Sequence, residues 1–306
     1  MGQDPLRPMT ILLFGAEGQL GRELAVSLAA LGPVTALCRS HVDLRTPLAA
    51  AAVIRSSRPQ FVVNAAGYTN VDAAESEPEL AQRINGDAVG EIAEACSSCG
   101  SHLLHFSTDY VFAGTGTAPH REEDPVGPVN AYGRSKLEGE RQAMNAGCQL
   151  TILRTSWLHA PRGKNFIRTV LALAQTRHEI SVVSDQVGAP TSARWLADIA
   201  SHIARRTLAG DRPTTRVLHA TSRGSASWHE VAQTALAIAV EAGMPSLIAK
   251  HSITPITSSQ LRSPAVRPLN SRLSIETLES TLGIECQAWI DGVRETACAI
   301  ARESLS

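Results

Sequence analysis

The sequence predicts an α/β fold in which a doubly wound parallel sheet carries a smaller C-terminal lobe. Short apolar runs alternate with helical stretches through the first half of the 306 residues, which is typical of parallel strands joined by crossover helices. The runs are almost continuously apolar, as expected for strands covered on both faces. A glycine-rich turn joins the first run to the first helix, where such folds hold phosphate groups.

The first half contains regularly alternating elements. Strands are expected where the apolar runs lie, at residues 9–15, 34–38, 60–66, 102–112 and 149–157. Helices are expected between them, at residues 18–31, 47–57, 79–100 and from 130 onward. This order indicates parallel strands that are neighbours in one sheet.

The second half is less regular. Helical spacing recurs near residues 164–176, 192–207, 227–242 and 287–301, and short apolar runs lie at 180–183 and 216–220. Prolines at 255, 264 and 268 interrupt the remainder. We therefore expect a disordered leader at residues 1–8, a sheet domain mainly at 9–160, and a lobe mainly at 161–306 with elements that return to the sheet.

The composition is that of an ordinary globular protein. Hydrophobic residues make up 43%, charged residues 19% and aromatic residues 4%, and the formal net charge is -1. This balance does not indicate a nucleic-acid or membrane partner. The six cysteines do not suggest a disulfide framework. No apolar run approaches the roughly 18 residues of a membrane span, and the first run has no signal-peptide cleavage site, so we expect a cytoplasmic location.

The glycine turn has the spacing of a dinucleotide-binding loop. Gly15, Gly18 and Gly21 lie at three-residue intervals in FGAEGQLG, between the first strand and the first helix. The first allows a tight turn, the second lets the backbone approach a phosphate, and the third lets the helix pack closely on the sheet. The N–H groups at the helix N-terminus favour an anion. The sheet domain is therefore predicted to be Rossmann-like and to bind a dinucleotide.

The residue after the second strand distinguishes the two nicotinamide dinucleotides. An acidic side chain there favours NADH, and an arginine favours the 2′-phosphate of NADPH. Arg39 occupies this position, so NADPH is preferred and NADH is the alternative. Asp43 is expected either beside the adenine or in a solvated loop. The other residues expected to bind the cofactor are Gln19, Leu20, Leu44, Ala65, Ala66, Tyr68, Tyr132 and Lys136.

A phenol and an amine lie four residues apart in NAYGRSKLEGE, residues 130–140. On a helix, Tyr132 and Lys136 share one face. Hydride transfer to a ketone leaves charge on oxygen, which needs a proton donor. Tyrosine, with a pKa of about 10, is the expected donor, and the lysine is expected to lower that pKa and to hold the cofactor ribose. Thr108, at the end of the fourth strand, is preferred over Ser107 to hold the carbonyl oxygen.

Several stretches together resemble one family. They are FGAEGQLG, NAAGYTNVDAAE, FSTDYVFAG, NAYGRSKLEGE, LRTSWLH, VVSDQVGAPT and RPLNSRL, spread over residues 10 to 275. The chain resembles the extended short-chain dehydrogenase/reductase superfamily and, within it, the dTDP-4-dehydrorhamnose reductases. In that family, the residues that match Thr108, Tyr132 and Lys136 form the catalytic set.

The resemblance implies an enzyme that reduces the 4-keto group of dTDP-4-dehydro-L-rhamnose with NADPH or NADH. The product, dTDP-L-rhamnose, is a precursor of cell-surface polysaccharide. The resemblance places substrate contacts at Thr69, Val71, Thr108, Asp109, Tyr110 and Trp157. The Trp157 indole either covers the sugar or base or is a core side chain. Asn165 and Arg168 serve either phosphates or packing, and Arg168 is preferred for the diphosphate.

The resemblance also implies possible partners. Some relatives bind magnesium through acidic side chains at a dimer interface, so a homodimer and a Mg²⁺ ion are expectations, with no metal ligand assigned. The partner of the site is a nucleotide sugar, a small molecule.

Other functions use the same scaffold. Nucleotide-sugar dehydratases resemble this chain but carry Asp and Glu after the threonine, where this chain has Asp109 and Tyr110, and this disfavours elimination. Epimerases retain their nicotinamide through each turnover, and a reductase of another nucleotide sugar would share the motifs. The regulatory beta subunit of methionine adenosyltransferase is also similar to this family, and it binds a dinucleotide without being an enzyme.

Overall fold

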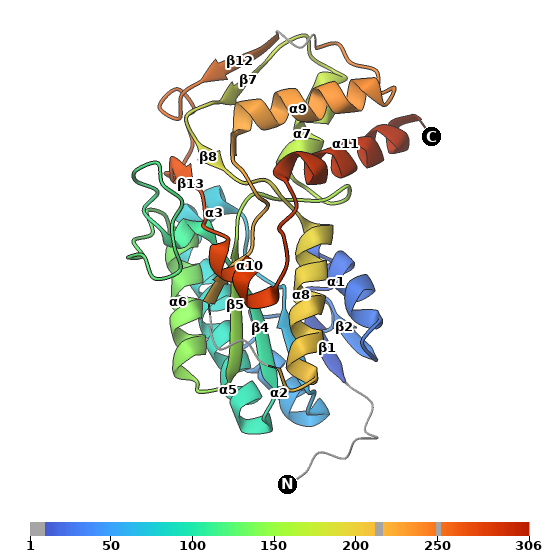
Figure 1. Ribbon diagram of the computed structural model, residues 1–306. Coiled ribbons are helices and arrows are strands. Elements are labelled where there is room, and N and C mark those ends of the chain that lie inside the picture. Colours follow the sequence, from blue (N-terminus) through green and yellow to red (C-terminus); the bar gives the residue numbers. More distant parts are fainter. Residues whose placement is uncertain (1–9, 212–216, 249–251, 306) are drawn as a thin grey trace.

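Six parallel strands form the central sheet of the computed structural model, which describes residues 10–211, 217–248 and 252–305. The strands lie in the order β10-β5-β4-β3-β1-β2 (Figure 1). They are β1 Ile11–Phe14, β2 Val34–Leu37, β3 Phe61–Asn64, β4 His102–Thr108, β5 Gln149–Thr155 and β10 Val217–His219. The chain changes its direction across the sheet between β1 and β3, and ligands of parallel sheets bind beside such a point. The leader predicted at residues 1–8 lies outside the described residues.

Helices cover both faces of the sheet, which confirms the doubly wound fold (Figure 1). The side chains of β1 alternate between the two layers: Ile11 and Leu13 pack with α1 and α8, whereas Leu12 and Phe14 pack with α2 and α5. The strand is apolar on both faces because both are buried. The helices of the two layers are α1 Gln19–Ala29 and α8 Ala193–Leu208, and α2 Ala49–Ser57, α5 Ala88–Cys99 and α6 Ala131–Asn145.

The fourth strand is shorter than predicted. It was expected at residues 102–112 but stops at Thr108, whose hydroxyl accepts a hydrogen bond from the Tyr110 N–H and begins a 3₁₀ helix at Asp109–Val111. Apolar periodicity does not report a side-chain cap of this kind. The helix expected at 79–100 is likewise interrupted. Its parts are α4 Pro78–Gln82, a π-helical turn at Arg83–Asp87 and α5.

A smaller lobe lies at the carboxyl edge of the sheet (Figure 1). Its core is formed by α7, α9 and α11 with the strand pair β7–β12, while β10 and α8 belong to the sheet layers. The sequence did not predict α3, α10 or the two-residue strands, because such short elements carry too little periodicity. It also did not predict β12, which contains Pro255 and lies in the stretch expected to be irregular. The remaining bounds are α3 Val71–Ser76, β6 Leu158–His159, α7 Phe166–Ala174, β7 Ile180–Val183, β8 Val187–Gly188, β9 Thr191–Ser192, β11 Ala226–Ser227, α9 Trp228–Glu241, β12 Ile253–Ile256, β13 Asn270–Ser271, α10 Glu276–Leu282 and α11 Trp289–Leu305.

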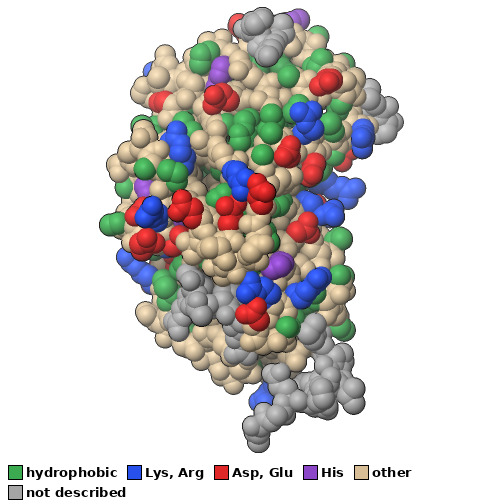
Figure 2. Space-filling model, in the orientation of Figure 1, with side chains coloured by type: hydrophobic (Ala, Val, Ile, Leu, Met, Phe, Trp, Pro, Cys, Tyr) green, Lys and Arg blue, Asp and Glu red, His purple; other side chains and the backbone are tan. Residues whose placement is uncertain are grey.

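The surface and the cysteines agree with the composition. Basic and acidic side chains are interspersed on the face drawn in Figure 2. Among the described residues, no helix is both long enough and apolar enough to cross a membrane. The six cysteines are free thiols.

Candidate active site

A groove runs along the carboxyl ends of the parallel strands. It consists of two adjoining cavities of about 280 Å³ and about 410 Å³, which we name the outer and the inner cavity. Both are lined by Gly18, Ala65, Ala66 and Gly67, so the groove is continuous. The outer cavity is also lined by Phe14, Gly15, Glu17, Cys38, Arg39, Val42, Asp43, Leu44, Tyr68 and Ile84. The inner cavity is also lined by Gln19, Leu20, Asn64, Thr69, Asn85, Phe106, Ser107, Thr108, Asp109, Tyr132, Lys136, Thr155, Ser156, Trp157, Leu158 and Lys164.

The glycine turn lies where the two cavities meet. Gly15 has a φ of 81°, and a Cβ there would lie 2.6 Å from the Ala66 nitrogen, so the position requires glycine. A Cβ on Gly21 would overlap the carbonyl oxygen of Gly15, which shows how closely α1 approaches the turn. Gly18 precedes α1 and provides no side-chain cap. The first N–H groups of the helix are therefore available to a phosphate.

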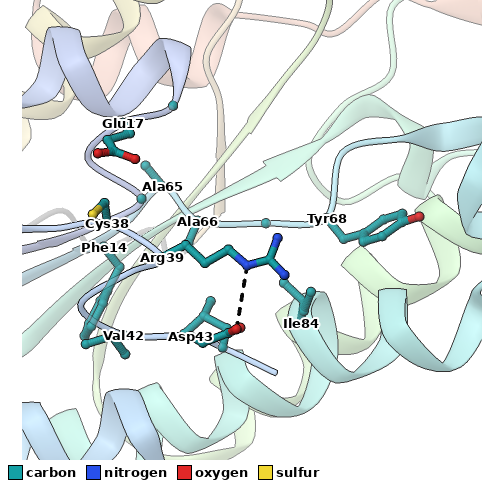
Figure 3. A pocket seen from close by; sticks show the side chains of 14 residues that line it. Phe14, Glu17, Cys38, Arg39, Val42, Asp43, Ala65, Ala66, Tyr68 and Ile84 are labelled. Carbon is teal, nitrogen blue, oxygen red and sulfur yellow. Dashed lines mark ion pairs between the residues drawn. The ribbon is translucent and has the colours of Figure 1, made fainter. Parts of the chain in front are cut away.

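The outer cavity ends in exposed charged side chains (Figure 3). The Arg39 side chain is 70% exposed, and its Nε lies 3.6 Å from Asp43 Oδ2. Arg45 Nε donates to the same oxygen at 2.8 Å, and hydrogen bonding from Arg45 is the main cause that lowers the pKa of Asp43 to about 2. The exposed Arg39 guanidinium is well suited to bind a further anion such as a phosphate.

The start of α6 is anchored to the lobe. Asn130 Oδ1 accepts a hydrogen bond from the Gly133 N–H at 2.8 Å, and Asn130 Nδ2 donates to the Val266 carbonyl at 2.8 Å. The first contact caps the helix, and the second ties the cap to the lobe. Tyr132 and Lys136 lie on this anchored helix, and the structure brings both to the inner cavity.

Lys136 is buried beside β4. Its Nζ donates to the Phe106 carbonyl at 2.6 Å and lies 3.3 Å from His105 Nε2. Burial lowers the pKa of Lys136 to about 8, and Glu140 opposes this shift. A lysine in this state loses its proton more readily than an exposed one.

The pKa of Tyr132 is shifted in the direction opposite to the one expected. Burial raises it to about 12, although hydrogen bonding with the Thr108 side chain acts in the other direction. The expected lowering by Lys136 is wrong for this arrangement, because the lysine amine is directed at the Phe106 carbonyl. The phenol therefore remains protonated at neutral pH, as a proton donor must.

Three buried oxygen atoms of the inner cavity have no hydrogen-bond partner among the described residues. They are Ser107 Oγ, Asp109 Oδ2 and Thr155 Oγ1. Buried polar atoms are normally hydrogen-bonded, so these atoms can bond a polar ligand that enters the inner cavity. Burial also raises the pKa of Asp109 to about 7, against the opposing effect of the Ser271 and Thr108 side chains.

Trp157 is both a packing residue and a wall of the inner cavity. Its ring stacks on Trp228 with centroids 3.5 Å apart and planes inclined by 8°. Its φ of 48° lies in the left-handed region, which is uncommon for a non-glycine residue. Such a conformation persists where the surroundings hold it in place, and the Trp157 carbonyl accepts a hydrogen bond from the Thr191 N–H at 3.2 Å. The two alternatives that the sequence left open are therefore compatible.

Five of the residues expected to bind ligands do not line the groove. They are Gly21, Val71, Tyr110, Asn165 and Arg168. Gly21 acts on the groove through its packing against Gly15. Val71 begins α3. Tyr110 packs edge-on against the Tyr132 ring, with centroids 5.8 Å apart.

The two phosphate candidates of α7 have other partners. Asn165 caps α7 by accepting from the Arg168 N–H at 3.0 Å, and its Nδ2 donates to Gln19 Oε1 at 2.8 Å. The Arg168 guanidinium pairs with Glu303 at 3.0 Å and lines a separate cavity. Arg168 is therefore not placed to bind a diphosphate in the groove, since its guanidinium is paired with Glu303 of α11. Asn165 instead contacts Gln19 at the start of α1, next to the glycine turn.

Lys164 lines the inner cavity and was not predicted. The sequence contains only three lysines, Lys136, Lys164 and Lys250, and the first two line this cavity. Gln19 Nε2 donates to the Lys164 carbonyl at 3.1 Å, which ties the lysine to the glycine turn. Lys164 is a single exposed residue that belongs to no spaced motif, so the sequence pattern did not mark it as a site residue. The scarcity of lysine was the available signal.

The acidic metal ligands that the resemblance implies are not located. The described ranges contain no group of three or more His, Cys, Asp or Glu side chains placed to hold a metal ion.

Comparison with known proteins identifies relatives over most of the chain. A family model described as the RmlD substrate binding domain matches residues 9–301. A dTDP-4-dehydrorhamnose reductase of Burkholderia thailandensis is 47% identical over 286 residues, covering 92% of this chain and 95% of that protein. The dTDP-4-dehydrorhamnose reductase of Escherichia coli K12 is 41% identical over 291 residues, covering 94% and 96%.

Solved structures of the same kind share the fold. A dTDP-4-dehydrorhamnose reductase of Clostridium acetobutylicum superimposes with a TM-score of 0.85 at 33% identity, covering 94% of this chain and 98% of that one. The Bacillus anthracis dTDP-4-dehydrorhamnose reductase in complex with NADP gives 0.84 at 29% identity, covering 95% and 99%. The chain therefore belongs to the family of the RmlD substrate binding domain, in which its relatives are dTDP-4-dehydrorhamnose reductases.

Proposed function

We propose that this protein reduces the 4-keto group of dTDP-4-dehydro-L-rhamnose to dTDP-L-rhamnose with a nicotinamide dinucleotide. The observation that carries the proposal is the convergence of Thr108, Tyr132 and Lys136 on one cavity that continues into the glycine turn. The relatives at 47% and 41% identity are named for this reaction.

The groove fits a dinucleotide along its length. The uncapped N–H groups at the start of α1 suit the pyrophosphate, and the turn is open to it because Gly15 and Gly18 line the outer cavity without a side chain. The shared wall of Ala65, Ala66 and Gly67 lets one extended molecule occupy both cavities. When bound, the reduced nicotinamide supplies the hydride.

The residues of the inner cavity position the substrate oxygen and deliver a proton to it. Tyr132, held protonated by its raised pKa, donates its hydroxyl hydrogen to the substrate oxygen as charge develops there. Thr108, whose side chain interacts with the same phenol, holds that oxygen in line. The phenolate left on Tyr132 needs a nearby cation, and Lys136 is the candidate on the same helix face.

NADPH is the preferred cofactor in this proposal, with NADH as the alternative. Arg39 lines the outer cavity and carries an exposed guanidinium, which suits a 2′-phosphate. The Bacillus anthracis relative was solved with NADP.

One competing function, that of a dehydratase, is less well supported by the residues of the inner cavity. A dehydratase needs a second carboxylate where Tyr110 stands, and this side chain packs against Tyr132 outside the cavity. The thymine base and the product configuration rest on the relatives alone.

An absorbance assay tests the proposed reaction. With enzymatically prepared dTDP-4-dehydro-L-rhamnose, NADPH should be consumed in equal amount to the sugar reduced. Conversion of the sugar to an isomer without net consumption of NADPH would indicate an epimerase, which retains its nicotinamide. No consumption, together with stoichiometric capture of a synthetase subunit, would indicate a regulatory protein.

A homodimer, a Mg²⁺ ion and a cytoplasmic location remain predictions from the resemblance and the composition. Light scattering measures the first, and activity after treatment with a chelator measures the second.

A further inference from the structure

The side-chain amide of Asn64 has its orientation fixed by the backbone. Asn64 ends β3, and its Oδ1 accepts a hydrogen bond from the Ala66 N–H at 3.1 Å. A backbone N–H can only donate, so the amide oxygen must face it. The Nδ2 group then lies 3.3 Å from His105 Nδ1. Both side chains are fully buried, so this contact has no competition from solvent.

The amide orientation determines the tautomer of His105. The Asn64 NH₂ group is a donor, so Nδ1 of the imidazole must accept. Burial, and after it the positive charge of Lys136, lower the pKa of His105 well below its usual value, so the ring is neutral and carries a single proton. That proton must sit on Nε2, the nitrogen that lies 3.3 Å from Lys136 Nζ.

An N–H group aimed at Nζ is unfavourable for an ammonium and favourable for a neutral amine. The ammonium has no lone pair to accept it, whereas the neutral amine has one. The other close partner of Nζ is the Phe106 carbonyl at 2.6 Å. This contact is available to both forms, because the neutral amine retains hydrogens to donate.

Four titratable groups of the described residues bear on Lys136. On its own helix, Glu140 favours the ammonium, but Glu140 pairs with Arg154 of β5 at 2.7 Å. Tyr132 lies one turn earlier on α6, and Asp109 follows β4 at the same cavity. His105 is thus the titratable group in direct contact with Nζ.

We propose that Asn64 and His105 form a buried relay that disfavours the ammonium form of Lys136, which makes His105 a positioning residue for proton transfer. The catalytic consequence rests on the proposed function. After Tyr132 has given its proton to the substrate oxygen, the Lys136 ammonium passes a proton to the phenolate. The neutral amine then accepts a hydrogen bond from the Nε2–H group of His105, which keeps its proton, and a proton from solvent restores the ammonium as product leaves.

Histidine ¹⁵N NMR of the intact protein tests the tautomer directly. The His105 signals are assigned by their loss in His105→Gln. The proposal expects protonated Nε2 and unprotonated Nδ1 at about neutral pH. A ring protonated on Nδ1, or on both nitrogens, would overturn it. This measurement needs no turnover, so its result is independent of whether the proposed reaction is correct.

Lysine titration tests the effect on Lys136. Protein labelled at lysine Cε gives signals from only three residues, and Lys136→Met assigns the relevant one. In Asn64→Asp, the new carboxylate accepts from Nδ1, so Nε2 becomes an acceptor and the Lys136 midpoint should rise by about one pH unit.

Two controls separate the relay from other causes. The double variant Asn64→Asp/His105→Phe retains the added charge without the imidazole, and most of the rise should be lost. His102→Gln alters a buried histidine at the other end of β4, which contacts Thr151 at 3.0 Å, and should leave the midpoint unchanged. An unchanged midpoint in Asn64→Asp, or an equal rise in the double variant, would contradict the relay.

Discussion

The inner and outer ends of the groove each contain an aspartate, and their surroundings shift its pKa in opposite directions. At the inner end, burial raises the pKa of Asp109 to about 7. At the outer end, hydrogen bonds from Arg45 lower the pKa of Asp43 to about 2. The inner end is thus a desolvated pocket in which burial determines where protons reside, and the outer end is a solvated surface that binds by charge.

This difference predicts where substitutions have large effects. Interactions are stronger in a region of low dielectric constant, whereas solvent screens exposed charges. Changes at the inner end should therefore alter rate and stability strongly. Changes at the outer end should alter cofactor affinity moderately.

The largest expected effect is that of Tyr132→Phe. The substitution keeps the ring but removes the proton donor, so kcat should fall by ~10²–10⁴-fold. NADPH affinity should change by no more than about twofold, since the hydroxyl serves the transition state. Steady-state kinetics and a fluorescence titration of NADPH measure the two quantities. Normal turnover would remove Tyr132 from the mechanism.

The pH dependence of stability should distinguish the two aspartates. The folded-state pKa of Asp109 lies above its ordinary value of 3.8, so folding favours the protonated form and wild-type stability falls as the pH rises from about 4 to about 7. At about pH 8, Asp109→Asn should be more stable than wild type by on the order of 2–4 kcal/mol, a difference that vanishes near pH 4. Urea unfolding at both pH values measures it.

The matched variant at the outer end is Asp43→Asn. The pKa of Asp43 is lowered, so the stability that its carboxylate contributes is lost only as the pH falls from about 4 through about 2. The stability difference from wild type should therefore stay constant between about pH 5 and about pH 8. A pH trend in this range as steep as that of Asp109→Asn would show that burial does not separate the two ends.

A smaller effect is expected where the two cavities meet. Lys164 lines the inner cavity beside the glycine turn, so Lys164→Ala should weaken NADPH binding by about tenfold while kcat changes little. Lys164→Arg keeps the charge and should retain most of the affinity. If the alanine variant and wild type bound NADPH with equal affinity, Lys164 would not contact the cofactor.

The smallest effect is expected at the outer end. Arg39→Gln should raise KM for NADPH by about fivefold and leave KM for NADH unchanged, since NADH lacks the 2′-phosphate. Arg45→Gln, which removes a charge nearby but outside the cavity, should not change the preference. An equal rise of KM for NADPH and for NADH would show that Arg39 does not bind the 2′-phosphate specifically.

The parallel sheet and most of the groove followed from local patterns. Glycine spacing, strand–helix alternation and the four-residue interval between Tyr132 and Lys136 are properties of short stretches, and the structure places each at the carboxyl edge of the sheet. The early stop of β4 at Thr108 required a side-chain hydrogen bond that periodicity does not report.

The protonation states could not be predicted from the sequence. Lys136 was expected to lower the pKa of Tyr132, but its amine meets the Phe106 carbonyl and His105, and burial raises the pKa of the phenol. Arg168 was expected at the diphosphate, but α11 supplies Glu303 as its partner. Both outcomes depend on which elements meet in space.

The most direct test follows a labelled hydride from the cofactor to the sugar. With NADPH deuterated at the transferable position of carbon 4 and dTDP-4-dehydro-L-rhamnose, mass spectrometry and NMR of the product should show one deuterium at sugar carbon 4. An unlabelled reduced sugar, or a deuterium elsewhere on the ring, would contradict reduction of the keto group in the inner cavity.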